Sequence, residues 1–405
     1  MPGGEVGMKK FKIPQRAKLI LVITALIVFF EPQSFKEDYF PLLITVDSIY
    51  RIFKLILSYI IITMYLLEKR ISKAWTFMAI FQVIACLATV VNHGSLIRFV
   101  GPAITTLVMI ACGEYIIKEK WLQPVTKVVL WYFRSVFAIN LITVLLINFI
   151  PGMSDRMMYF MGIDNRWIFT ILPWMLFEFI NYYQDKKQRN RCFMAWLSSE
   201  ILLLCMWSVA AMIINFFWVV LFLGRVKILR RKMIAFYVLL MANALVVGAK
   251  IQMIFAEPIR MLGKDITLSG RTYIWDKILS DLPGNLLLGH GMQIMENDKA
   301  YFGSANPELS HIYVAHAHNS FMTVFYRFGL ISLLLYTYNY YLAFKNIAKV
   351  EGKLTNIFFV VLVMTLILGI FDTFDAAVLY LVFGLCQGIG DKGKVTIRCL
   401  TQKSQ

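Results

Sequence analysis

The sequence predicts an all-α polytopic membrane protein with about twelve transmembrane helices and one large extracytoplasmic loop. Of its 405 residues, 59% are hydrophobic and only 16% are charged. The mean hydropathy of +0.67 is well above that of soluble globular chains. The net charge of +17 is spread over short basic clusters between apolar runs, which is how topology signals are distributed. Because these clusters form no single face or domain, we expect no partnership with nucleic acid.

Twelve apolar segments are candidates for spans, because a bilayer core about 30 Å thick needs roughly 20 apolar residues at helical rise. The first follows a basic stretch and has no small-residue cleavage site, so we interpret it as an uncleaved span rather than a signal peptide. The stretch 192–224 is the least clearly divided, because no polar turn separates its two short segments. The twelve segments lie near 17–31, 41–67, 74–92, 96–117, 127–150, 167–183, 192–208, 209–224, 233–255, 320–344, 354–371 and 375–390.

The charges between these segments predict the orientation in the membrane. Alternate connections are rich in lysine and arginine, such as QDKKQRNR and RVKILRRK, and the others carry acids, such as FDTFD. The positive-inside rule therefore places both termini in the cytoplasm and the long loop outside the plasma membrane. The predicted parts are a membrane bundle of about nine spans (1–255), the extracytoplasmic loop (256–319), the last spans (320–390) and a cytoplasmic tail (391–405).

The loop 256–319 is the part of the chain in which chemistry is expected. It has about 64 residues, far more than an ordinary connection, which indicates a function or a structure of its own. Residues 271–282 have the apolar spacing of a short amphipathic helix, ended by Pro283 and Gly284. The loop also holds four of the five histidines: His290, His311, His316 and His318.

Arg271 is the first candidate for binding a substrate. A guanidinium group near the headgroups can form two hydrogen bonds to a phosphate or diphosphate and stays charged at any relevant pH. An arginine at this position can equally anchor the loop to phospholipid headgroups. Position alone favours the anchor.

His316 and His318, in the run HAHNS, have three open interpretations. Histidine is the side chain best suited to remove a proton from a sugar hydroxyl near neutral pH. With His311 upstream, a zinc site is a competing interpretation. The third is a helix start at the membrane surface, capped by Asn319 or Ser320. Two further acids, Asp372 and Asp375, resemble a metal-binding pair, although two acids on an outer turn are more often only solvated.

Several charges fall within the apolar segments, where they are costly and indicate either function or pairing. Three of them, Arg51, Arg98 and Lys250, lie toward the outer half of the membrane, where a lipid diphosphate would be. Arg134 and Glu178 are candidates for a buried ion pair. The full set is Asp47, Arg51, Lys54, Arg98, Arg134, Glu178, Glu200, Lys250 and Arg327.

Taken together, R-x3-W-x7-P-x5-G-x-G followed by HAHNS-x8-G resembles the signature region of the O-antigen polymerase/O-antigen ligase superfamily. The spacing from His318 to Gly329 is more similar to that of the polymerases. These motifs cover about 60 residues, and the layout of a dozen spans with one large late loop is also similar. The residues that carry the resemblance are Arg271, Trp275, Pro283, Gly289, Gly291, His316, His318, Asn319 and Gly329.

The resemblance implies a GT-C-like membrane glycosyltransferase acting on undecaprenyl-diphosphate-linked oligosaccharide. A polymerase joins such repeat units into capsule, O-antigen or exopolysaccharide, and a ligase transfers the finished glycan to lipid A core. A chain-length regulator and a flippase would be partners, besides the lipid bilayer. By resemblance, Arg271 holds the diphosphate and His318 is the catalytic base. The substrate-binding set would be His316, Asn319, Trp275, Gly289 and Gly291, with Arg51, Arg98 and Arg260 competing for the role of the family's second arginine.

The expected chemistry needs neither a cofactor nor a metal. A diphosphate on an anomeric carbon is already a good leaving group, so the protein has to stabilise its charge and deprotonate the acceptor. Direct displacement by one acceptor predicts inversion, and the lack of a D-x-D pair in the loop favours metal independence. The alternatives are a lipid-linked-oligosaccharide flippase, which would predict inverted repeats and broken spans, and a metal-dependent hydrolase on the outer face.

Overall fold

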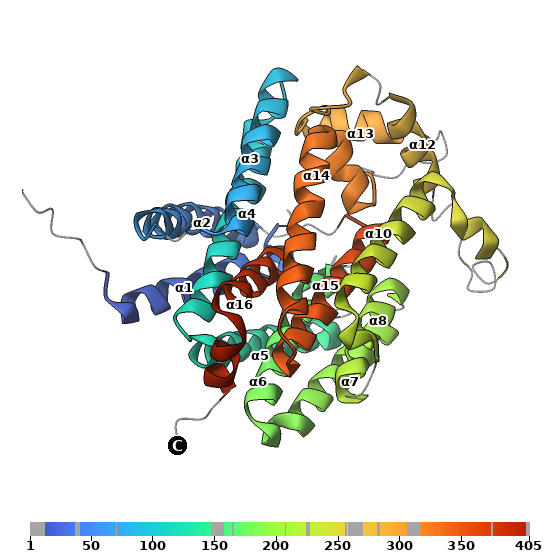
Figure 1. The fold of residues 1–405 in the computed structure, drawn as a ribbon. Helices are drawn as coiled ribbons and strands as arrows, with labels where there is room; N and C mark the ends of the chain where they lie inside the picture. The colour runs from blue at the N-terminus through green and yellow to red at the C-terminus, as the bar shows by residue number, and fades with distance from the viewer. Residues whose placement is uncertain are drawn as a thin grey trace, which may run out of the picture.

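The computed structural model describes residues 13–36, 41–69, 71–146, 149, 158–163, 166–206, 208–223, 227–255, 257, 270–281, 284–305, 316–373 and 376–401. Within these residues the chain is almost entirely helical (Figure 1). The helices of the first half are α1 (Gln15–Phe29), α2 (Pro41–Leu67), α3 (Lys73–Val91), α4 (Leu96–Lys118), α5 (Leu122–Leu146) and α6 (Ile168–Gln184). Strands β1 (Met158–Tyr159) and β2 (Gly162–Ile163) form a small antiparallel hairpin between α5 and α6.

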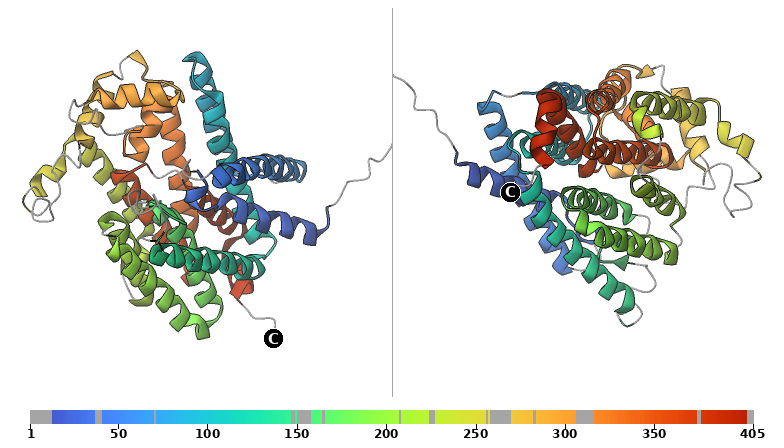
Figure 2. Two further views of the ribbon diagram at one scale, coloured as in Figure 1. Left: turned by 180° about the vertical axis from the view of Figure 1, so that it is seen from behind. Right: turned by 60° about the horizontal axis from the view of Figure 1, so that its bottom comes forward.

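The second half contains helices of very different lengths. They are α7 (Arg189–Cys205), α8 (Val209–Phe216), α9 (Val219–Leu223), α10 (Lys232–Gly248), α12 (Arg271–Asp281), α13 (Met295–Gly303), α14 (Ser320–Ala348), α15 (Lys353–Phe371) and α16 (Ala377–Thr401). Short 3-10 helices occupy Gln33–Lys36, Lys186–Gln188, Lys227–Arg230 and Ile251–Phe255. In Figure 1 and Figure 2, α12 and α13 lie at one end of the bundle, and α16 finishes at the other. We refer to the first as the α12/α13 end.

The prediction of a helical, polytopic membrane protein is confirmed in this coarse form. Each of the twelve predicted segments overlaps helix among the described residues. The stretch 192–224 is divided into α7, which ends at Cys205, and α8, which begins at Val209, and these two helices pack against each other. Among the described residues, six helices are long and apolar enough to cross a membrane. They are Thr45–Leu67, Lys73–Val91, Leu96–Lys118, Leu122–Leu146, Ser320–Ala348 and Lys353–Phe371; the shorter apolar helices include Val209–Leu223, Lys232–Gly248 and Ala377–Asp391. The number of spans and their orientation stay predictions.

The centre of the bundle is the crossing of α4 and α16, which approach each other closely because glycines occupy the contact. A Cβ atom on Gly113 would lie 2.3 Å from the carbonyl oxygen of Leu381, and one on Gly384 would lie 2.1 Å from that of Ile110. Small residues at a helix crossing bring backbones close enough to pack without a hydrophobic driving force, as is usual in membranes. This crossing supports α3 and α14, which pack alongside it.

Helix α14 is broken at Gly329, and the loop 285–291 fills the break. Gly329 has φ 73° and ψ −174°, which are not helical. The carbonyl of Tyr326 accepts from the backbone N–H of His290 at 2.9 Å, and the N–H of Leu330 donates to Leu286 at 2.9 Å instead of to Tyr326. The loop therefore satisfies the backbone groups that the break would leave without partners, which is the condition for irregular backbone at membrane depth.

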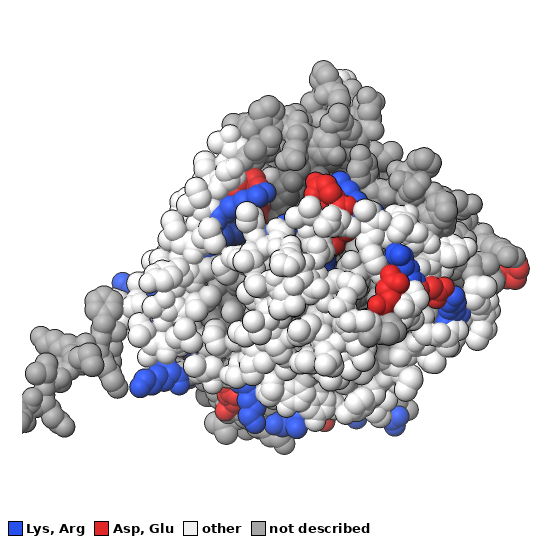
Figure 3. All heavy atoms as spheres, turned by 90° about the horizontal axis from the view of Figure 1, so that it is seen from above, with Lys and Arg blue, Asp and Glu red and all other residues white. Residues whose placement is uncertain are grey.

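Most of the charges within the apolar segments are paired, as the sequence suggested they would be if they had no other function. Arg134 binds both carboxylate oxygens of Glu178, at 2.8 and 2.9 Å, which confirms the expected ion pair. Figure 3, which views the α12/α13 end, shows acidic and basic side chains lying next to each other on a largely uncharged surface. The other ion pairs are Lys54 with Glu31, Arg51 with Asp47 and Lys250 with Asp276, and Glu200 accepts a hydrogen bond from the neutral amide of Asn215.

Replacing Gly329 with alanine should destabilise the protein by at least about 1–3 kcal/mol, because φ is positive and the new Cβ atom would lie 2.2 Å from the carbonyl oxygen of Leu287. Gly101→Ala is the matched control: Gly101 lies in α4 with no atom within 4 Å of an added Cβ, and alanine there should be neutral or stabilising by roughly 0.5–1 kcal/mol. Unfolding measured in detergent micelles compares the two. Equal stability of both variants would show that the break is not constrained as described.

Candidate functional site

The candidate site forms at the α12/α13 end, where the segment 316–319 enters α14 and where α15 ends. Asn319 is the N-cap of α14, and its side chain accepts from the N–H of Met322 at 2.9 Å. The same amide donates to the carbonyl of Ile370 in α15 at 3.2 Å and to Asn243 in α10 at 3.3 Å. The expected cap is therefore present, and it also joins the start of α14 to the end of α15.

Both histidines of HAHNS face Asp372, the first residue after α15. Nδ1 of His318 lies 3.1 Å from Oδ1 of Asp372, and Nε2 of His316 lies 3.7 Å from the same oxygen. The backbone N–H of Thr373 donates to that oxygen at 2.7 Å and so orients the carboxylate. A proton on Nδ1 of His318 satisfies the carboxylate, and this tautomer leaves Nε2 as a proton acceptor.

Neighbouring charges and hydrogen bonds keep Asp372 ionised, and burial keeps His316 neutral. Burial alone would raise the pKa of Asp372, but the hydrogen bond and charge of His318, the Thr373 amide and the charge of Arg271 together lower it. Burial, followed by the charge of His318, lowers the pKa of His316 to about 3. Near neutral pH the site therefore holds a carboxylate beside a neutral His316 imidazole.

Arg271 reaches the same turn from the first residue of α12. Its guanidinium donates to the carbonyl oxygen of Phe371, the residue before Asp372. Burial lowers the pKa of Arg271 and the charge of Asp372 raises it, and an arginine stays protonated throughout the physiological range. The two residues expected to carry the chemistry, Arg271 and His318, are thus brought to one turn.

Trp275 and a small apolar core hold α12 in this position. The indole N–H of Trp275 donates to the carbonyl of Ala317, between the two histidines, at 2.8 Å. Trp275 is buried together with Ile274 and Ile278 of its own helix and with Val247, Phe302, Ala317, Met322 and Tyr326. The tryptophan of the motif therefore places the backbone of the histidine segment.

Other candidates from the sequence lie elsewhere. Arg51 is on α2, where it pairs with Asp47 at 2.5 Å and its side chain is 72% exposed. Gly289 and Gly291 contact backbone, the first that of the α14 break and the second that of Ala88 and Thr89 in α3. His290 stacks on the ring of Tyr326. Arg260, Pro283, His311 and Asp375 lie outside the described residues.

Asp372 is the residue whose role the sequence did not indicate. The sequence grouped it with Asp375 as an acid pair, whereas its partners are His316 and His318, more than 50 residues earlier in the chain. Only the packing of α14 against α15 brings these groups together. Residues of one helix that lie close together can be recognised from their spacing in the sequence. His318 and Asp372 belong to different elements, so no spacing indicates that they meet.

The same three side chains form a possible metal-binding set. One ligand atom each from His316, His318 and Asp372 lies within 4.8 Å of the others. Two imidazoles and a carboxylate are a common ligand set for zinc, and three protein ligands would leave a fourth position open. The zinc interpretation that the sequence left open therefore gains a third ligand, Asp372, in a different role from that of a hydrogen-bond partner.

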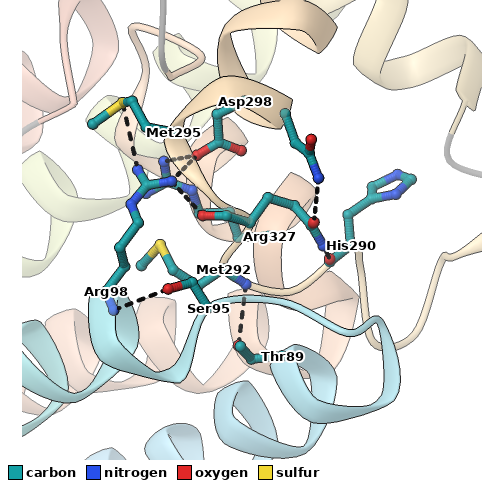
Figure 4. A network of polar contacts seen from close by, with 10 residues as sticks. Thr89, Ser95, Arg98, His290, Met292, Met295, Asp298 and Arg327 are labelled. Atoms are coloured by element: carbon teal, nitrogen blue, oxygen red, sulfur yellow. Dashed lines mark hydrogen bonds and ion pairs between the residues drawn. The ribbon is translucent and has the colours of Figure 1, made fainter.

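A second polar cluster lies nearby and joins α4, α13 and α14. Arg98 and Arg327 both bind Oδ2 of Asp298, at 3.2 and 3.0 Å, and Arg98 also donates to the carbonyl of Gln293. Figure 4 shows both guanidinium groups pointing at this carboxylate. Asp298 is fully buried, which raises its pKa, while the charges of Arg327 and Arg98 lower it. Arg98 is thus engaged with α13 and with the residues just before it.

Residues 192–337 match the family model described as O-antigen ligase. The matched range begins in α7, ends within α14 and contains Arg271, Trp275, His316, His318 and Gly329. The match supports the O-antigen ligase/polymerase superfamily and so confirms the resemblance seen in the motifs. No curated protein and no solved structure matches the chain.

Replacing Asp298 with alanine should cost about 3–5 kcal/mol of stability, because it leaves two largely buried arginines without their carboxylate. Asp276→Ala is the matched control, since it removes the acid of an ion pair whose side chains are 42% and 46% exposed and should cost no more than about 1 kcal/mol. Denaturant titration in detergent micelles measures both. A loss for the Asp298 variant as small as that of the control would contradict the description of a buried, shared carboxylate.

Proposed function

We propose that this chain, similar over residues 192–337 to the O-antigen ligase family, is a membrane glycosyltransferase that polymerises oligosaccharide repeat units. Its substrate would be an undecaprenyl-diphosphate-linked oligosaccharide, and its product capsule, O-antigen or exopolysaccharide. The observation that carries the proposal is the convergence of His318 and Arg271 on the turn at Asp372. The charge pattern favours cytoplasmic termini and a site on the outer face of the plasma membrane, where a flippase would deliver the substrate.

Arg271 stabilises the leaving diphosphate. As the bond between the anomeric carbon and the diphosphate oxygen breaks, negative charge develops on the phosphate oxygens, and a fixed guanidinium there lowers the barrier. A guanidinium has five N–H donors, so the bond to Phe371 leaves others to bind a phosphate. The bond to Phe371 also holds the side chain in place before substrate arrives.

His318 removes the proton from the acceptor. The acceptor oxygen attacks the anomeric carbon, its proton passes to Nε2 of His318, and the diphosphate departs with the electron pair of the broken bond. Asp372 accepts from Nδ1 and stabilises the imidazolium that forms, which its lowered pKa allows at neutral pH. Attack opposite to the leaving group inverts the anomeric carbon.

The remaining residues of the proposed site hold the histidine segment and α14 in place or bind the sugar. Trp275 and Asn319 hold residues 317–319 against α12 and α15. Gly289 and Gly291 are the close contacts that hold the first half of α14 against the loop and α3. His316, neutral and beside His318, is placed to hydrogen-bond a sugar hydroxyl.

Two other functions remain candidates because specific observations favour them. An O-antigen ligase would use the same residues and differ only in its acceptor, lipid A core, and the family match agrees with it equally. A metal-dependent hydrolase on the outer face is favoured by the ligand set His316, His318 and Asp372.

His318→Ala should reduce polymer formation by at least about 10²-fold, because it removes the base, and should leave single repeat units on the lipid. His93→Asn is the matched control: it changes a histidine at another turn, also with positive φ, to a residue that tolerates that conformation. Product ladders on gels compare the two in cells or with purified protein. Unaltered chain lengths in the His318 variant would reject the proposed base.

Purified protein incubated with lipid-linked repeat units and EDTA should still produce a ladder, since guanidinium groups replace a metal at the diphosphate. As a second measurement, the zinc content of the wild-type protein is compared with that of an Asp372→Asn variant. If chelation abolishes the ladder and zinc restores it, and if the wild type but not the variant contains zinc, the protein is a metal-dependent transferase. Zinc-dependent cleavage of the repeat units without any ladder would indicate the hydrolase instead.

A further inference from the structure

A pocket of about 140 Å³ lies where α6 ends and α15 begins. Its wall contains two lysines, Lys186 from the 3-10 helix after α6 and Lys353 from the first residue of α15. The amide of Asn356 and the ring of Tyr182 complete its polar side. We call it the lysine pocket. The 19 residues of α15 separate it by about 28 Å from the turn of Asp372, so it is remote from the candidate site.

The two lysines of this pocket lie close together without an acid between them. Nζ of Lys186 lies 4.3 Å from the centre of the Tyr182 ring, and burial, followed by the charge of Lys353, lowers the pKa of Lys186. In the described part of the chain neither lysine has a carboxylate partner. The nearest acids in the sequence, Asp185 and Glu351, do not line the pocket, and Asp185 caps its own 3-10 helix. An anion bound between the two ammonium groups would remove their repulsion.

An apolar cavity of about 710 Å³ adjoins the lysine pocket. Leu229 lines both of them. Along α15 the wall passes from Asn356 and Ile357 in the lysine pocket to residues between Phe359 and Ile367 in the apolar cavity. These eight further positions extend about 12 Å along the helix. The two spaces therefore form one path that is cationic at the start of α15 and apolar along its length.

The apolar cavity opens at the side of the bundle. Ile234 and Val238 of α10 line it, yet their side chains are 55% and 59% exposed. In Figure 1, α8 and α10 lie on the flank of the bundle away from α1 and α2. Arg231, which also lines the cavity, precedes Lys232, and Nζ of Lys232 donates to Thr355 in the first turn of α15 at 3.0 Å. A third cation is thus placed at the same end as the two lysines.

We propose that the lysine pocket and the apolar cavity together bind one anionic phospholipid. Its phosphate lies between Lys186 and Lys353, and one of its acyl chains lies along α15. Anionic lipids of the cytoplasmic leaflet attract lysine and arginine at the membrane surface, and the charge pattern favours this end of the bundle as the cytoplasmic one. The inference does not rest on the proposed function, in which the lipid-linked substrate is held by Arg271 at the opposite end.

Native mass spectrometry of the full-length protein in detergent micelles, titrated with phosphatidylglycerol or with phosphatidylcholine, counts the bound lipids and gives their Kd. Wild type should bind one phosphatidylglycerol per chain more tightly than it binds phosphatidylcholine. Lys186→Gln and Lys353→Gln should each weaken the binding of phosphatidylglycerol about 5-fold, and together about 30-fold, because each removes a cation beside the anionic headgroup. The binding of phosphatidylcholine should not change.

The matched control is the double variant Lys187→Gln, Lys349→Gln, which removes two exposed lysines that line neither space and should bind both lipids as wild type does. Val238→Trp fills the apolar cavity from an exposed position without a change of charge, so it should weaken the binding of both lipids. A large excess of glycerol 3-phosphate, a soluble phosphate, should not displace phosphatidylglycerol.

Three outcomes would overturn the inference. The first is equal binding of phosphatidylglycerol by the Lys186/Lys353 variant and by its control. The second is unaltered lipid binding by the Val238 variant, and the third is displacement by glycerol 3-phosphate, which would indicate a soluble anion instead of a lipid. None of these measurements depends on polymer formation, so the proposed function stands or falls separately.

Discussion

The backbone interlock between the loop 285–291 and the broken helix α14 is the constraint on which the site depends. A helix interrupted at membrane depth exposes N–H and C=O groups that lipid cannot satisfy. Here the loop supplies partners to the carbonyls of Tyr326 and Arg327 and to the N–H of Leu330, so these three groups stay hydrogen-bonded across the break. Because Gly289 and Gly329 have no side chains, the two backbones can come close enough to form them. The short first half of α14, and with it the histidine segment, is thereby held in one position.

Charge is distributed in this bundle according to whether it is neutralised inside the protein. Arg134 with Glu178 and Lys54 with Glu31 are complete pairs, and a complete pair has little left with which to bind a ligand. At the α12/α13 end the balance differs, because two arginines share one aspartate there and Arg271 binds a carbonyl oxygen. The charges at this end are therefore not divided into separate one-to-one pairs.

The electrostatics of the histidine pair follow from the same arrangement. Two imidazoles whose centres are 4.2 Å apart cannot both be protonated at little cost, and Asp372 bonds the nearer one, His318. The two imidazoles therefore differ: that of His318 is oriented by a carboxylate, and that of His316 is half-buried and neutral. A metal ion would use both imidazoles in the same way, so chelation separates the two chemistries.

The sequence by itself determined the helical, membrane-embedded character of the chain, the position of each apolar helix and the group of motifs around Arg271 and His318. These properties are local, since hydropathy and the spacing of a motif are read within a few turns of chain. The tertiary structure alone decided that Asp372 meets the histidines, that Arg98 and Arg327 share Asp298, and that Gly289 and Gly329 let the loop pack into the break in α14. These contacts join residues between 29 and 200 positions apart, or backbones whose closeness leaves no periodic signal. They depend on how helices pack, which hydropathy does not encode.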